Sequence, residues 1–213
     1  TLISAKRSRG AVLIWSDTAM YQMQLVGAPF TFGFSQLGAN CGAVGQNCTI
    51  DVNGTAFWMG KDSFFMFDGS VQKLKCSVED YVFTDISSGS QRDSFAANNS
   101  EFNEVTWFYA SSGSTVIDRC VSYNYADQVW SVGTLPRSSW IDKGVYEYPY
   151  ATSYSASDTA ATISTITGLT AGRAYMYAQE FGNDADGAAM TSYVESGDFV
   201  FPEAGEYLMS IKR

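Results

Sequence analysis

Three of the five tryptophans of this chain, Trp15, Trp58 and Trp107, recur at nearly regular intervals, and this repeat constrains the fold more than any other feature of the sequence. Trp58 follows Trp15 by 43 residues, and Trp107 follows Trp58 by 49. Each tryptophan lies in a short apolar run, and a polar turn and a further aromatic run follow it. Periods of about 40 to 50 residues, with about four strands each, are typical of β-propeller blades. The repeat therefore predicts an all-β chain of propeller-like blades built from antiparallel strands.

Runs of strand length and β-rich composition support this prediction. The clearest are residues 12–15, 19–26, 49–52, 56–59, 64–67, 105–109, 119–125 and 128–132. Asn53-Gly54 and Asp68-Gly69 separate such runs and predict hairpins, since these dipeptides favour two-residue turns. Ala126-Asp127 and Asp186-Gly187 predict two further turns. Helical periodicity is weak: we expect a turn or two of helix at 78–86 and a loop at 98–102.

About four blade-like units fit in the 213 residues, and the strand pair 173–181 and 190–199 forms the last of them. We predict a single propeller-type β domain over residues 1–213. Large propellers usually close with more blades, and the chain starts at Thr1 and ends on a strand-like run, so we expect a fragment of a larger propeller. The Ser/Thr-rich segment 151–172 is predicted to be an inter-blade loop or surface excursion. An ordinary long loop with a short strand at 162–166 is the alternative.

Composition narrows the chemistry that this chain can perform. There are 13 Lys and Arg against 22 Asp and Glu, a net charge of -9, and no histidine. The missing histidine removes the Ser-His-Asp triad, the Cys-His dyad and HExxH zinc sites. The acidity argues against a broad electrostatic grip on nucleic acid, which needs clustered Lys and Arg. We predict that the protein is not an enzyme, with no catalytic residues, no cofactor and no metal. No apolar run approaches the ~20 residues of a membrane span, so no membrane-spanning segment is expected.

The four cysteines, Cys41, Cys48, Cys76 and Cys120, lack the CxxC pairs of a zinc ribbon. We interpret them as buried free thiols, which indicates a reducing site of synthesis. A Cys41–Cys48 bridge across a glycine-rich loop is the alternative.

Two groups of acidic residues resemble sites without meeting their full pattern. Residues 183–187, with Glu180 nearby, have the alternating oxygen ligands of a calcium loop. Counting from Asp184, however, Gly187 falls at position 4 rather than 6, and a plain Asp-Gly hairpin explains the segment. A glycosidase needs two facing carboxylates, and the acids considered for such a pair are Asp17, Asp62, Asp68 and Asp80. Turn formation explains at least three of these four.

Two further clusters have alternative interpretations that the sequence leaves open. Lys6, Arg7 and Arg9 form a basic cluster near the start, which is either a contact for phosphate or an acidic partner or a solvated loop. Tyrosines flank Pro149 at positions 146, 148, 150 and 154. They are either a subunit contact, since Tyr is favoured at interfaces, or a loop that packs onto its own blade.

Several long stretches of the chain resemble structural proteins of tailed bacteriophages. They are residues 37–45, 57–69, 74–83 and 102–109, then Glu195 to Phe199 and Leu208 to Arg213. The resemblance is to the tail-nozzle or packaged-DNA stabilisation proteins of short-tailed phages. It covers roughly residues 10 to 150 and 173 to 213 and leaves the Ser/Thr-rich segment unmatched. These are packing signatures, so they indicate the family more firmly than the role.

The resemblance implies a β-propeller that assembles as a ring, typically of six copies, under the portal and adaptor of the virion tail. Such a ring closes the head-tail channel, retains packaged DNA and passes it on ejection, without binding it specifically. It also implies assembly in the cytoplasm of a host bacterium, with the portal, adaptor and other tail proteins as partners. An acidic lining suits a DNA conduit, since carboxylates repel phosphate. Two alternatives remain: a carbohydrate-binding or receptor-facing propeller module, and a glycosidase-type propeller enzyme.

Overall fold

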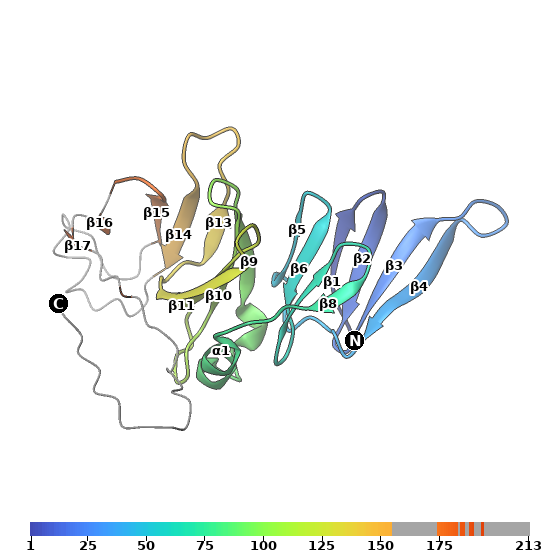
Figure 1. The fold of residues 1–213 in the computed structure, drawn as a ribbon, viewed down its shortest axis with the longest axis horizontal. Coiled ribbons are helices and arrows are strands. Elements are labelled where there is room, and N and C mark those ends of the chain that lie inside the picture. Colours follow the sequence, from blue (N-terminus) through green and yellow to red (C-terminus); the bar gives the residue numbers. More distant parts are fainter. Residues whose placement is uncertain (155–173, 183, 186–187, 190–192, 194–213) are drawn as a thin grey trace, which may run out of the picture. The chain divides into compact units, whose positions relative to one another are not determined.

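A computed structural model describes residues 1–154, 174–182, 184–185, 188–189 and 193 of the chain. It divides into two units, Thr1–Phe181 and Gly182–Arg213. The larger unit holds four antiparallel sheets, three of four strands and one of three, each with its strands in sequence order (Figure 1). The all-β prediction is therefore confirmed. Strand pairing among the described residues does not close these sheets into a barrel.

The first sheet comprises β1 (Leu2–Ser8), β2 (Ala11–Ser16), β3 (Ala19–Leu25) and β4 (Phe32–Ala39). The β1–β2 turn is Arg9-Gly10, both with positive φ (42° and 83°). Sequence reasoning anticipated β2 and β3 but neither outer strand. The alternation of β4 is broken by Gly33 and Gly38, and its strand conformation depends on its pairing with β3.

The second sheet comprises β5 (Thr49–Val52), β6 (Thr55–Met59), β7 (Phe64–Phe67) and β8 (Val71–Lys73). Asn53 and Gly54 form its first turn with φ of 53° and 86°. Positive φ at both central residues defines a type I′ turn, the geometry that an Asn-Gly pair accommodates. Asp68-Gly69 forms the β7–β8 turn, so both hairpins expected here are confirmed.

The third sheet comprises β9 (Phe95–Asn99), β10 (Glu104–Tyr109), β11 (Arg119–Asn124) and β12 (Val129–Thr134). Two short helical segments precede it, α1 (Glu79–Asp85) and the 3-10 turn η1 (Gln91–Asp93). The short helix expected at 78–86 and the turn expected at Ala126-Asp127 are both present. The loop expected at 98–102 is partly strand, because Asn98 and Asn99 end β9 and pair with β10.

The fourth sheet comprises β13 (Ser139–Ile141), β14 (Tyr150–Tyr154) and β15 (Ala174–Ala178). Strand β14 runs into the start of the Ser/Thr-rich segment, and the strand expected at 162–166 lies outside the described residues. In the smaller unit, β16 (Asp184–Ala185) pairs with β17 (Ala188–Ala189), as expected for a hairpin at Asp186-Gly187. The run 190–199 lies outside the described residues, apart from Tyr193.

The first strands of successive sheets are neighbours and run in the same direction. Strand β1 contacts β5, β5 contacts β9, and β9 contacts β13. Asn47, just before β5, forms a parallel bridge with Phe95 at the start of β9. The Ser4 hydroxyl lies 2.9 Å from the Thr49 hydroxyl, and Ser8 Oγ donates to the Gly54 carbonyl. The four sheets therefore repeat in one orientation about a row of parallel first strands.

Aromatic side chains fill the spaces between successive sheets. Trp15 meets Trp58 between the first and second sheets, with ring centroids 5.5 Å apart. Phe64 meets Trp107 between the second and third sheets at 4.8 Å, and Phe108 meets Trp140 between the third and fourth at 6.0 Å. The core is thus a series of layers between sheets.

The tryptophan repeat places each tryptophan on the equivalent strand of its sheet, but not on the same face of that sheet. Trp15, Trp58 and Trp107 all lie on the second strand of their sheets and are fully buried. Trp58 and Trp107 face the preceding sheet, whereas Trp15 faces the following one. Side chains of a strand alternate between the two faces of the sheet. On β2 it is therefore Ile14, the neighbour of Trp15, that lies on the face equivalent to the one that carries Trp58.

Candidate functional site

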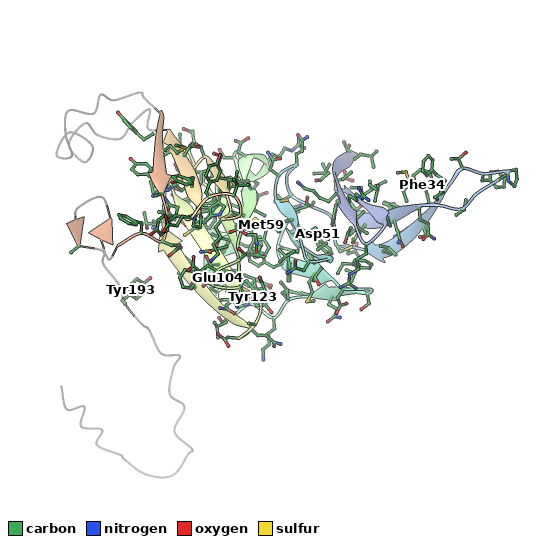
Figure 2. The ribbon with its side chains drawn as sticks, turned by 90° about the horizontal axis from the view of Figure 1, so that it is seen from above. Phe34, Asp51, Met59, Glu104, Tyr123 and Tyr193 are labelled. Atoms are coloured by element: carbon green, nitrogen blue, oxygen red, sulfur yellow. The ribbon has the colours of Figure 1, made fainter. Side chains whose placement is uncertain are left out.

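The face of the first sheet that points away from the second sheet is apolar and largely uncovered. Strand register places its side chains together. We call this the first open face, and its apolar members are Val12, Ile14, Tyr21, Met23, Leu25, Phe32 and Phe34. Leu25 is 72% exposed, Phe32 52% and Phe34 67%. Figure 2 labels Phe34 on the β3–β4 hairpin, apart from Met59 and Asp51 of the second sheet.

The same face is covered in every other sheet of the larger unit. In the second sheet it carries Trp58, which packs on Trp15. In the third it carries Trp107, which packs on Phe64, and in the fourth Trp140, which packs on Phe108. The first open face is thus the one member of this series without a preceding sheet among the described residues.

The segment that forms most of this face is unusually free of charge. No Asp, Glu, Lys or Arg occurs from Thr18 to Ile50 in a chain that is 16% charged. The tip of the β3–β4 hairpin adds Val26, 52% exposed, and Phe30, 73% exposed. Monomeric proteins rarely expose a large contiguous apolar patch, so this surface is a candidate contact site. The charge-free stretch was its sequence signal, and our sequence reasoning did not use it.

A hollow lies next to the first open face, between β1 and the residues that precede β5. It has a volume of about 470 Å³ and is lined by residues 2–6 with Ile14, Gln46 and Asn47. Ala5 and Ile14 belong to both the hollow and the open face. The contact surface is therefore hollowed at its β1 side.

The fourth sheet has a face of the opposite orientation that no described residue covers. The side chains on it, which we call the second open face, are Ser139, Ile141, Tyr150, Thr152, Met176 and Ala178. Met176 is 71% exposed and Ile141 53%. The hydroxyls of Ser139 and Thr152 lie 2.6 Å apart, so they satisfy one another. This face is equivalent to the face of the third sheet that carries Phe108 and packs on the next sheet.

Acidic residues gather where the first strands end. The turns at this end of the sheets, together with the strand residues Asp51 and Glu104 beside them, are here called the acidic rim. The turns carry Asp68, Glu101, Asp127, Asp142 and Glu147. Asn98 Nδ2 donates to Asp142 at 2.7 Å, and Lys143 pairs with Glu101 at 3.2 Å. Burial, with Glu180 nearby, raises the pKa of the Glu104 carboxyl, which Figure 2 labels. The rim therefore presents more carboxylates than its own cations neutralise.

The cysteines are free thiols, as expected, and the alternative Cys41–Cys48 bridge is not formed. Cys41, Cys48 and Cys120 are buried, and Cys76 is half-buried. Burial raises the pKa of Cys48, Cys76 and Cys120 to about 11 in each case. These thiols are therefore protonated and poor nucleophiles at neutral pH.

The four aspartates considered as glycosidase carboxylates take ordinary structural positions. Asp17, Asp62 and Asp68 lie in the β2–β3, β6–β7 and β7–β8 turns, as the turn interpretation expects, and Asp80 lies in the first turn of α1. The N-terminal ammonium hydrogen-bonds Asp17 at 3.0 Å and lowers the pKa of that carboxyl. Asp68 accepts a hydrogen bond from the Ser70 amide in its own turn.

The basic cluster is divided between strand and turn. Lys6 and Arg7 belong to β1, with Arg7 on the same face as Val12. Arg9 lies in the β1–β2 turn, where its side chain passes over Gly54 of the next sheet. The three cations therefore do not form one binding site.

The tyrosine run packs partly within its own sheet and loop. Tyr146 meets Tyr150 edge-on at 5.4 Å, and Tyr148 meets Phe181 at 5.2 Å. These contacts support a loop that packs onto its own sheet, although Tyr146 is still 53% exposed.

The described residues contain no group of three or more Cys, Asp or Glu side chains placed to hold a metal ion. The calcium-like run 183–187 lies largely outside the part of the chain that the structure describes. No helix in that part is long and apolar enough to cross a membrane. No protein-family model and no curated protein matches this chain.

Proposed function

We propose that this chain is a non-enzymatic structural protein of a phage virion. It forms part of a tail nozzle ring that closes the head-tail channel, retains packaged DNA and passes it on ejection. Its copies associate in a ring, with six as the expected number, next to the portal, the adaptor and other tail proteins. The ring is assembled in the cytoplasm of the host bacterium, which the free cysteines support.

The repeated sheet is the observation that carries this proposal. Successive antiparallel sheets with strands in sequence order, set side by side through parallel first strands, are the arrangement of propeller blades. We therefore propose that the four sheets are blades of a propeller-like domain. In the layers between the sheets, fully buried side chains such as Trp58 and Trp107 serve packing.

The acidic rim supports a passage for DNA rather than a binding site. Carboxylates at Asp68, Asp127 and Glu147 repel phosphate, and a surface of this charge does not hold DNA by counterion release. Transient passage without specific binding follows if the rim lies at the mouth or wall of the channel.

The decisive experiment measures the mass of the native particle by light scattering and locates the protein by imaging virions. A closed ring on the tail axis is the expected result. A stable monomer that is absent from virions would overturn the proposal, and glycan arrays and glycoside turnover would then test the carbohydrate-binding and glycosidase alternatives.

A further inference from the structure

We infer that the chain binds a divalent cation, Ca²⁺, between its third and fourth sheets through the side chains of Asn99, Glu104 and Glu180. The site lies within one chain, so the inference goes beyond the proposed function and does not depend on it. It also departs from our prediction of no metal. The three residues belong to different parts of the chain, so no spacing of ligands in the sequence indicates the site.

Strand register places Asn99 and Glu104 side by side on the third sheet. Asn99 ends β9, Glu104 begins β10, and the two are direct partners in the β9–β10 pairing. Directly opposed residues of an antiparallel pair point to the same face of a sheet. Since side chains alternate along β10, this is the face that carries Phe108 and packs on the fourth sheet. Figure 2 labels Glu104.

Glu180 reaches the same place from the fourth sheet. It follows β15, and its Oε1 accepts a hydrogen bond from Asn99 Nδ2 at 3.0 Å. Glu180 also lies near the Glu104 carboxyl, because its charge is the second cause, after burial, of the raised pKa of Glu104. Two carboxylates and one amide therefore converge from two sheets.

The Asn99 carbonyl oxygen is the observation that points to a ligand. Asn99 is 4% exposed, and its Oδ1 accepts no hydrogen bond from any described residue. A buried carbonyl oxygen without a partner is costly, so native proteins rarely leave one. Ionised carboxylates only accept hydrogen bonds, so neither Glu104 nor Glu180 can supply the missing donor. A cation satisfies all three groups at once.

No cation of the described residues neutralises the two carboxylates. The side-chain ion pairs in that part of the chain belong to Lys73, Arg119 and Lys143, and none of them includes Glu104 or Glu180. Two like charges held close together disfavour the ionised state of both. A divalent cation between them replaces this repulsion by attraction to a common centre.

The ligand chemistry favours Ca²⁺. Carboxylate and amide oxygens suit a hard cation, and Ca²⁺ accepts irregular geometry and completes its coordination with water. Softer metals prefer imidazole or thiolate ligands, and this chain has no histidine. A bound Ca²⁺ joins the β9–β10 end of the third sheet to the segment that follows β15, and so fastens the fourth sheet to the third.

The test measures Ca²⁺ binding to the full chain after a chelator has removed metal. Titration calorimetry gives the affinity, and thermal unfolding with and without Ca²⁺ gives the stability. Glu104→Gln and Glu180→Gln each remove one charge and keep the shape of the side chain. Glu147→Gln is the matched control, because it removes an exposed carboxylate of the same acidic rim in the β13–β14 loop. Circular dichroism checks that each variant folds.

We expect Ca²⁺ to raise the melting temperature of the unmodified chain and of Glu147→Gln alike. Glu104→Gln and Glu180→Gln are each expected to bind Ca²⁺ roughly 10-fold more weakly or worse, because affinity depends on the number of charged ligands. Without Ca²⁺ the order reverses. Glu104→Gln is then expected to melt above the unmodified chain, since it relieves the repulsion from Glu180. A purely structural carboxylate would not produce this reversal.

Two outcomes overturn the inference. One is the absence of Ca²⁺ binding at millimolar concentration. The other is equal binding by Glu104→Gln, Glu180→Gln and Glu147→Gln, which indicates only diffuse attraction of Ca²⁺ to an acidic surface. A ring that assembles without binding Ca²⁺ leaves the proposed function intact and ends this inference alone. A monomer that binds Ca²⁺ through these residues does the reverse.

Discussion

Trp15 and Trp58 meet edge to face across the first and second sheets, with ring centroids 5.5 Å apart and ring planes at 63°. Their indole N–H groups differ. Trp58 Nε1 donates to the Cys41 carbonyl at 2.8 Å, whereas the buried Nε1 of Trp15 has no acceptor among the residues that the structure describes. The two tryptophans are equally buried, but only Trp58 contributes a hydrogen bond to this layer.

Replacing each tryptophan by phenylalanine separates packing from hydrogen bonding. Both substitutions remove similar volume, but Trp58→Phe also removes a buried hydrogen bond, while Trp15→Phe removes an unpaired donor. We expect Trp58→Phe to lower the free energy of unfolding by about 1 to 2 kcal/mol more than Trp15→Phe does. Urea unfolding of both variants measures this difference, and equal losses would contradict it.

The turn at Gly54 depends on both its conformation and its neighbour. Gly54 has φ of 86°, and a Cβ there would lie 2.3 Å from Arg9 Nε. Gly10 has a similar φ of 83° but nothing within 4 Å of the same position. Gly10→Ala is therefore expected to cost about 1 kcal/mol through φ alone, and Gly54→Ala more. Adding Arg9→Ala to Gly54→Ala should recover the excess, and no recovery in the double-mutant cycle would contradict the contact.

Gly42 allows the loop after the first sheet to approach the β2–β3 turn. A Cβ at Gly42 would lie 2.3 Å from the Asp17 carbonyl carbon and 2.5 Å from the Thr18 amide nitrogen, both backbone atoms. Because backbone cannot rotate away, we expect Gly42→Ala to destabilise the protein by about 2 kcal/mol or more. Gly144→Ala, where nothing lies within 4 Å, is the control and should change the melting temperature little.

Buried thiols make stability fall at high pH. The pKa of Cys48 is raised from 9.0 to about 11 in the folded chain by burial. Between these two values the unfolded state loses the thiol proton and the folded state keeps it, so ionisation favours unfolding. The stabilisation is complete below pH 9 and declines by up to about 1.4 kcal/mol per pH unit toward pH 11.

Cys48→Ala tests this contribution. The free energy of unfolding, measured from pH 7.5 to 10.5, is expected to decline less steeply in the variant than in the unmodified chain. Cys76 and Cys120 retain their own contributions, so a residual slope remains. Identical slopes for the two proteins would show that Cys48 titrates normally in the fold.

Local chemistry was enough to predict the central hairpins from the sequence. Asn53-Gly54 specifies a turn because both residues tolerate positive φ, and the flanking apolar runs match the observed β5 and β6 within one residue. The free thiols and the turn aspartates were likewise predictable, since each depends on its own residue type and near neighbours. The first and last strands of the first sheet were not, because β1 is mixed in polarity and β4 contains two glycines.

The sequence by itself determined that this chain forms antiparallel hairpins with aromatic strands, since turn residues and two-residue alternation act locally. Only the tertiary structure decided which face each strand buries. Trp15 and Trp58 lie on equivalent strands, yet a difference of one residue in register turns them toward each other rather than in the same direction. That choice leaves Ile14 and Phe34 on an uncovered face, because facing depends on the sheet that packs opposite, and no local pattern encodes that partner.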